Sequence, residues 1–128
     1  MIPDIEIKHY YKKYLEDANN DIKKFQDSYN TAKNVRDDNK KLITERFIEV
    51  LQSVGINLAD YKQEWVIGQY NEDKTLINIA YHKLEYFQDG EQRIALLHLI
   101  KYCNAIANCR KLHKLIELAK RRSELNFI

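Results

Sequence analysis

The stretch Ile94–Cys109 reads IALLHLIKYCNAIANC and carries apolar residues on nearly every face of a helix. It lies in a segment from Glu91 to about Arg122 that contains neither Gly nor Pro, the residues that most disfavour a helix interior. A helix that is apolar all round is usually a central, buried element. We therefore expect a long C-terminal helix at the centre of the fold. Its predicted core residues are Leu97, Ile100, Cys103, Ile106 and Ala107.

A second pattern lies in the first quarter of the chain. Apolar and aromatic residues recur there at alternating steps of four and three, which is a seven-residue repeat held for about three heptads. Such a repeat favours a narrow seam against one partner helix, and Arg36 and Asn39 are expected to end it. These positions, called the heptad stripe below, are Tyr11, Leu15, Ala18, Ile22, Phe25, Tyr29 and Ala32.

The boundaries of the N-terminal helices follow from capping signals. Pro3 and Asp4 are residues typical of a helix N-terminus, and a first helix is expected over about residues 4–34. A second helix is expected over about residues 40–54. The polar segment NVRDDNKK between them is a loop, a kink or a solvated helical turn, and one continuous rod is the alternative. Gly55 is expected to end the second helix, since glycine tolerates the left-handed conformation found there.

The middle of the chain fits two structures. In the first, Asn57 caps a helix LADYKQEWVI and Asp73 caps another, in which apolar residues recur at helical spacing up to Asp89-Gly90. In the second, EWVIGQY and TLINIAY flank the polar NEDK as the strands of a β-hairpin. The helical interpretation is favoured because the apolar spacing after Asp73 has a helical period.

The composition limits the fold class. With 128 residues the chain is the size of one domain, and three Gly and one Pro are too few for an all-β sandwich or barrel. No glycine-rich run is present to cradle phosphates. We expect a single helical domain over residues 1–128, all-α, as an irregular bundle of about four to five helices with long N-terminal and C-terminal helices.

The N-terminus MIPDIEIKHYY lacks the apolar region of a signal peptide, and no apolar stretch is long enough to cross a bilayer. The expected location is therefore intracellular, in the cytoplasm or within a virus particle, with both cysteines reduced. Lys, Asn, Ile and Tyr are abundant, and their AT-rich codons favour a phage or bacterial source.

Catalytic and metal-binding motifs are missing from the sequence. Cys109 and His113 are four residues apart and share a helix face, but His98 and Cys103 lie too far along or around the helix to complete a metal site. A Cys103 thiol on an apolar face stays protonated, which disfavours a dyad with either histidine. The carboxylate pairs lie on polar faces. We expect no enzyme, no metal and no cofactor.

Nine tyrosines in 128 residues favour protein–protein contact, because an aromatic ring supplies area with a polar handle. Packing within the chain is the alternative explanation for the same residues. The predicted interface residues are Tyr11, Tyr14, Leu15, Ala18, Ile22, Phe25 and Tyr29.

Nucleic-acid contact is a further hypothesis, although the formal net charge is only +2. The segment KHYYKKY interleaves cations with aromatic rings, as single-strand binders do. Bases near the end of the last helix would neutralise phosphates, or merely complement the helix dipole. These candidate contacts are Arg110, Lys111, Lys114, Lys120, Arg121 and Arg122.

The sequence therefore predicts a non-enzymatic structural or interaction protein, a subunit of a larger protein assembly, of which a phage virion component is one specific form. Its expected partners are other protein subunits, copies of itself or different chains, with no membrane and no small-molecule substrate. One alternative is a small nucleic-acid-associated or regulatory protein that uses the basic C-terminal helix. Another is an effector or inhibitor that binds a partner enzyme.

Overall fold

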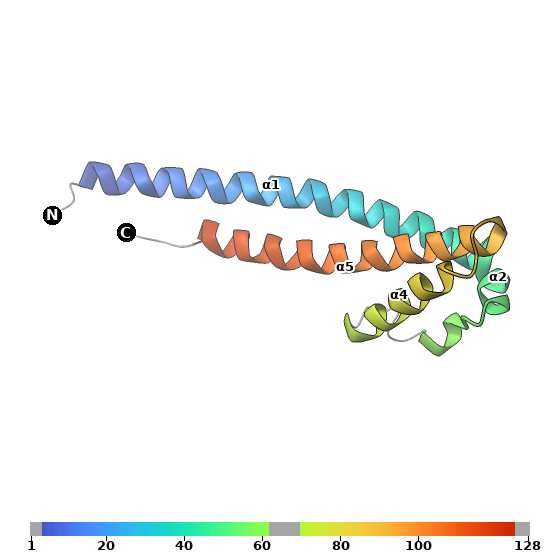
Figure 1. Ribbon diagram of the computed structural model, residues 1–128. Helices are drawn as coiled ribbons and strands as arrows, with labels where there is room; N and C mark the ends of the chain where they lie inside the picture. Colours follow the sequence, from blue (N-terminus) through green and yellow to red (C-terminus); the bar gives the residue numbers. More distant parts are fainter. Residues whose placement is uncertain (1–3, 62–69, 125–128) are drawn as a thin grey trace. The chain divides into compact units, whose positions relative to one another are not determined.

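The computed structural model describes residues 4–61 and 70–124, and within these ranges the chain is all-helical with no strand (Figure 1). The all-α prediction is therefore confirmed. In chain order the elements are α1 (Asp4–Leu42), the π-helix η1 (Ile43–Phe47), α2 (Ile48–Ser53), the 3₁₀ helix η2 (Leu58–Tyr61), α4 (Tyr70–Leu84) and α5 (Gly90–Glu124).

Three of these helices are long: α1, α4 and α5 have 39, 15 and 35 residues. The long terminal helices agree with the sequence, whereas the predicted count of four to five helices is not confirmed. The chain divides into two compact units. Unit 1 comprises residues 1–31 and 110–128, and unit 2 comprises residues 32–109, so α1 and α5 each contribute to both. The expectation of a single domain stays a prediction.

The polar segment NVRDDNKK lies inside α1, so the predicted end near residue 34 is wrong and the rod alternative holds as far as Leu42. The seven-residue repeat also continues further than expected. Asn39 and Ile43 are buried, and they continue the spacing of the heptad stripe beyond Ala32 and the half-buried Arg36. Asn39 is tolerated there because both ends of its amide are hydrogen-bonded, as described below.

The π-helix η1 interrupts the α-helical path directly after α1, and α2 follows it. Gly55, with φ of +86°, ends α2 as predicted. The amide of Gly55 donates to the carbonyl of Gln52 and the amide of Ile56 to the carbonyl of Leu51, which is the Schellman pattern. Both Leu51 and Ile56 are buried, so the chain re-enters the core as soon as the helix stops.

The middle of the chain is helical wherever it is described. The side chain of Asn57 accepts a hydrogen bond from the amide of Ala59 at 3.2 Å, so Asn57 caps the 3₁₀ helix η2. The rest of the predicted helix LADYKQEWVI, residues 62–67, lies outside the described residues. The segment TLINIAY lies within α4, and the hairpin alternative is wrong for it. Asp73 is not a cap, since α4 begins at Tyr70. Most of EWVIGQY falls outside the described residues.

A tight connection joins α4 to α5. Gly90 takes a φ of +82°, a conformation that suits glycine, and α5 begins with it. The guanidinium of Arg93 donates to the carbonyl of Phe87 at 3.1 Å and lies 3.5 Å from that of Leu84. The first turn of α5 thereby supplies a donor to the carbonyl of Phe87, which lies in the connection beyond the end of α4.

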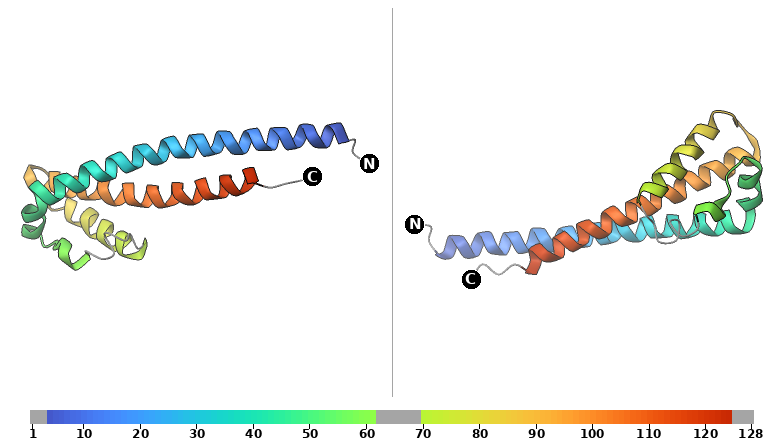
Figure 2. Two further views of the ribbon diagram at one scale, coloured as in Figure 1. Left: turned by 180° about the vertical axis from the view of Figure 1, so that it is seen from behind. Right: turned by 90° about the horizontal axis from the view of Figure 1, so that it is seen from below.

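Unit 2 holds the main apolar core, in which α4 lies beside the first half of α5 (Figure 2). Ile100, Cys103 and Ile106 are buried in it as predicted, and Ala107 is half-buried. Leu97 was expected in the core but is 38% exposed. The reason is that α5 is apolar all round while its neighbours cover only part of its circumference. Other large buried residues of this core are Ile43, Phe47, Leu51, Ile56, Leu76, Leu96 and Leu99.

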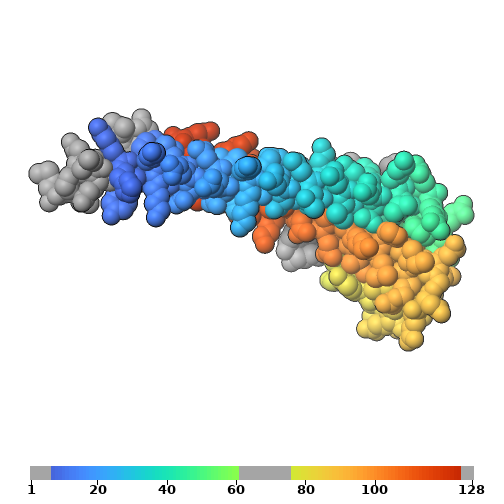
Figure 3. All heavy atoms as spheres, turned by 90° about the horizontal axis from the view of Figure 1, so that it is seen from above, coloured from blue at the N-terminus to red at the C-terminus, as the bar shows by residue number. Residues whose placement is uncertain are grey.

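Unit 1 pairs the N-terminal part of α1 with the C-terminal part of α5, antiparallel and side by side (Figures 1 and 2). Ala18 and Ala119 are fully buried where small side chains let the helices approach. Nη2 of Arg122 lies 2.6 Å from Oδ2 of Asp21, which ties the two helices together. The outer face of this part of α1 has no other described segment over it (Figure 3). No described helix is long and apolar enough to cross a membrane.

Candidate functional site

The heptad stripe within unit 1 is only partly covered. Of its positions there, Ala18 alone is buried, and the large side chains are half-buried. On the facing part of α5, Ile116 and Ala119 are buried, while Leu112 and Leu115 are half-buried. Packing within unit 1 therefore accounts for part of the stripe, as the internal-packing alternative requires. The half-buried interface candidates are Tyr11, Tyr14, Leu15, Ile22, Phe25 and Tyr29.

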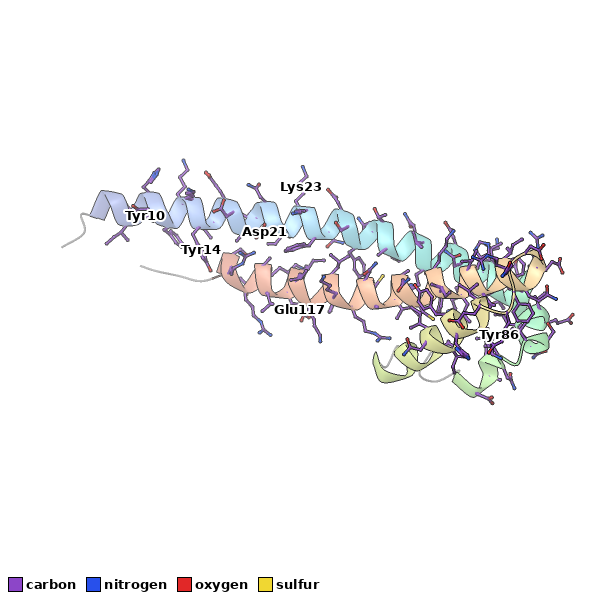
Figure 4. The ribbon with its side chains drawn as sticks, in the orientation of Figure 1. Tyr10, Tyr14, Asp21, Lys23, Tyr86 and Glu117 are labelled. Atoms are coloured by element: carbon purple, nitrogen blue, oxygen red, sulfur yellow. The ribbon has the colours of Figure 1, made fainter. Side chains whose placement is uncertain are left out.

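Apolar surface also continues past the N-terminal end of the heptad stripe. Ile7 precedes Tyr11 by four residues and so neighbours it on the surface of α1, although the strict repeat falls on Lys8, and the side chain of Ile7 is 44% exposed. Tyr10 flanks this end of the stripe and is 65% exposed (Figure 4). At 1.5 Å per residue, α1 is about 42 Å long within unit 1, whereas the described part of α5 there is about 22 Å long. The described α5 segment is thus about half as long as the helix it pairs with.

The basic C-terminal residues do not act as one group, because they point in different directions. Arg122 is used in the ion pair with Asp21, and Arg110 is half-buried. Lys120 is exposed on another side of α5. The remaining three, Lys111, Lys114 and Arg121, are exposed and share one face of α5 at helical spacing, with Leu118 between them at 55% exposure.

Glu117 lies next to this face and pairs with His113, whose Nε2 is 3.1 Å from its Oε1. Figure 4 shows Glu117 on the side of α5 that is turned away from α1. The three-cation face is therefore directed outward from unit 1.

The cysteines have the properties of structural thiols. Both are buried, and burial raises the pKa of Cys109 despite the nearby cations of Arg36 and Lys33. A thiol held in its protonated form is a poor nucleophile and a poor metal ligand. In residues 4–61 and 70–124, no group of three or more His, Cys, Asp or Glu side chains is placed to hold a metal ion.

One polar cluster in unit 2 was missed as a site by the sequence analysis. Nδ1 of His98 lies 2.7 Å from Oδ1 of Asn39, and Nδ2 of Asn39 donates to the carbonyl of Val35 at 2.7 Å. The ring of His98 stacks on Phe47, with centroids 5.4 Å apart and planes 19° apart. The guanidinium carbon of Arg46 lies 5.1 Å from the centroid of the Phe47 ring.

The charge state of His98 follows from these surroundings. Burial lowers its pKa, and the cations of Lys101 and Arg46 lower it further. His98 is therefore neutral near pH 7, with its proton on Nδ1, because Oδ1 of Asn39 accepts a hydrogen bond and cannot donate one. The signal in the sequence was Asn39 itself, a polar residue in register with the heptad stripe.

Comparison of the chain with protein-family models, with curated proteins and with solved structures finds no match.

Proposed function

We propose that the chain is a non-enzymatic structural or interaction protein, a subunit of a larger protein assembly that associates through the heptad stripe of unit 1. The observation that carries the proposal is the incomplete cover of this stripe. Its large side chains stay half-buried, and the exposed Ile7 extends the apolar surface about one helical turn beyond Tyr11.

A pair of helices leaves apolar surface accessible at the edges of its seam, and a further helix buries it. Fully burying a side chain of the size of Ile or Phe contributes about 1.5–3 kcal/mol, so even half of that gain at several positions favours association. Tyrosine suits such a surface because the ring is buried while its hydroxyl remains hydrated. The partner that fits is a helix with an apolar stripe of its own.

We propose a second copy of this chain as that partner. Acidic and basic residues nearly balance in the α1 part of unit 1, so two copies do not repel each other strongly. A repeating contact between identical chains is also what a building block of a virus particle or another assembly requires. The four-to-five-helix bundle and the intracellular or virion location belong to this proposal.

Sedimentation equilibrium over a range of protein concentrations tests it. The wild-type chain is expected to associate, and the double variant Ile7→Ser/Tyr10→Ser is expected to associate more weakly with its thermal stability preserved, because both side chains are exposed. Tyr86→Ser is a matched control, since Tyr86 is 70% exposed in unit 2. Monomeric behaviour of the wild type at every concentration would contradict self-association.

Nucleic-acid binding is a second candidate, favoured by the outward face of Lys111, Lys114 and Arg121. If each cation neutralises one phosphate, the logarithm of the binding constant falls with the logarithm of salt concentration with a slope of about −2 to −3. Fluorescence anisotropy with single-stranded and duplex DNA at several salt concentrations measures this slope. The third hypothesis, an effector or inhibitor of a partner enzyme, uses the heptad stripe in a complex of fixed stoichiometry.

A further inference from the structure

Two elements of unit 2 supply three nitrogen-bearing side chains, and two of these, the cations Arg46 and Lys101, act on the third, the imidazole of His98. His98 and Lys101 are three residues apart on α5, and so they are neighbours on its surface. Arg46 comes from η1, where its guanidinium lies over the ring of Phe47. Phe47 also stacks on His98, so Arg46 and His98 both contact its ring.

The imidazole of His98 is fixed in orientation. Its Nδ1 is committed to Asn39, which is only 6% exposed and is itself held by the carbonyl of Val35. The hydrogen bond leaves Nε2 as the nitrogen that is available to an outside group, and the ring is only part-buried. A proton on Nε2 would make His98 a third donor, in addition to the two permanent cations Arg46 and Lys101.

Within residues 4–61 and 70–124, no acidic side chain pairs with Arg46 or Lys101. Both charges that act on the His98 ring are cations. The ion pairs of Arg36 with Asp37, His113 with Glu117 and Arg122 with Asp21 all lie elsewhere in the described chain. An exposed Arg and Lys beside an oriented imidazole are the donors that proteins use for phosphate groups.

We propose that Arg46, His98 and Lys101 form a binding site for a phosphate group, either inorganic phosphate or a small phosphate monoester. Arg46 supplies a forked pair of donors, Lys101 a point charge, and His98 a donated Nε2–H when the ligand is bound. The π-helix η1 serves the site by placing Arg46 and Phe47 against α5, which fits the frequent occurrence of π-helical turns at functional sites. The site lies in unit 2 and is independent of the association proposed for unit 1.

Histidine NMR on the full chain tests the proposal, with inorganic phosphate and methyl phosphate as separate probes and sodium chloride at equal ionic strength as the reference. Bound phosphate stabilises the protonated imidazole, so the titration midpoint of His98 is expected to rise by about one pH unit at saturation, equivalent to a tenfold preference for that form. A response to both probes identifies a monoester site. A response to inorganic phosphate alone restricts the site to the free ion.

Arg46→Gln and Lys101→Gln are each expected to weaken phosphate binding about tenfold, the size of one charge-assisted hydrogen bond. Both side chains are exposed, so the variants are expected to fold, and the Nδ1 resonance of His98 without phosphate verifies this. Lys111→Gln, in unit 1, is the matched control and keeps wild-type binding. A His98 shift no larger than in chloride, a shift that does not saturate, or equal shifts in all three variants would each overturn the proposal.

Discussion

Nδ1 of His98 donates a hydrogen bond to Oδ1 of Asn39 over 2.7 Å, and this bond links α5 to α1 within unit 2. The contact lies between buried apolar residues, with Ala32 before Asn39 on α1 and Ile43 after it at the start of η1. A single buried polar pair in an apolar seam loses its hydrogen bond if the helices shift by a turn. The pair therefore sets the register of the two helices, and it also fixes the orientation of the His98 ring.

Replacing Asn39 with Ala is expected to lower the free energy of unfolding by about 1–3 kcal/mol, because the Nδ1–H of a part-buried His98 loses its acceptor. His98→Ala alone should cost a similar amount. In the double variant the two losses should not add, with a coupling energy of about 1 kcal/mol between them. Denaturant unfolding of the four proteins measures the coupling, and strict additivity would show that the bond contributes nothing to stability.

The stability of unit 2 should decrease in mild acid because of His98. Its pKa in the folded chain is lowered from the ordinary value of 6.5, so the unfolded chain binds the proton more readily. The folded state accordingly keeps its full stability above pH 6.5 and loses part of it as the pH falls from 6.5 toward the folded value. Urea midpoints measured across this range should show the loss in wild type and a smaller loss in His98→Gln. Identical profiles would exclude His98 as the cause.

Ile100 and Leu97 provide a matched pair for testing the core. Ile100 is 6% exposed, and Ile100→Ala should cost about 2–5 kcal/mol through lost burial and the cavity left behind. Leu97 is 38% exposed, and Leu97→Ala should cost about 1 kcal/mol or less. Thermal or denaturant unfolding of both variants measures the two losses of stability. A larger loss for Leu97→Ala would restore the prediction made from the sequence, which placed both residues inside.

Gly55, Leu97 and Asn39 show which features of the fold the sequence predicts and which it does not. Gly55 could be predicted as a helix end, because only a glycine readily takes the positive φ that the turn needs. Leu97 could not be placed, because the pattern of α5 shows which residues are apolar but not which side its neighbours cover. Asn39 was expected to end the heptad stripe because a polar residue rarely lies in an apolar seam. The partner that makes its burial possible, His98, is 59 residues away along the chain, so the local sequence does not reveal it. The His98 site depends on the same long-range contact, and no local spacing indicates it.

The cysteines should be chemically silent. Both are buried, and the raised pKa of Cys109 keeps its thiol protonated at neutral pH. Alkylation by iodoacetamide should be slow in the native chain and fast after unfolding. Cys103→Ala/Cys109→Ala should keep association while losing some stability through the missing volume. Zinc bound stoichiometrically to the wild type and lost from the double variant would contradict this expectation.

The half-buried tyrosines at the N-terminal end of the heptad stripe separate association from internal packing. Tyr11 and Tyr14 lie on the stripe face of α1, where unit 1 covers only part of each ring. In an assembly the remaining ring surface becomes buried, so Tyr11→Ser/Tyr14→Ser should weaken association by more than it lowers the unfolding free energy of the monomer. Internal packing alone gives the opposite order, because the rings would then have nothing further to bury. Melting temperature at low concentration and sedimentation at high concentration, both on this double variant, measure the two effects. A lowered melting temperature together with unchanged association would show that these tyrosines stabilise unit 1 and do not form its interface.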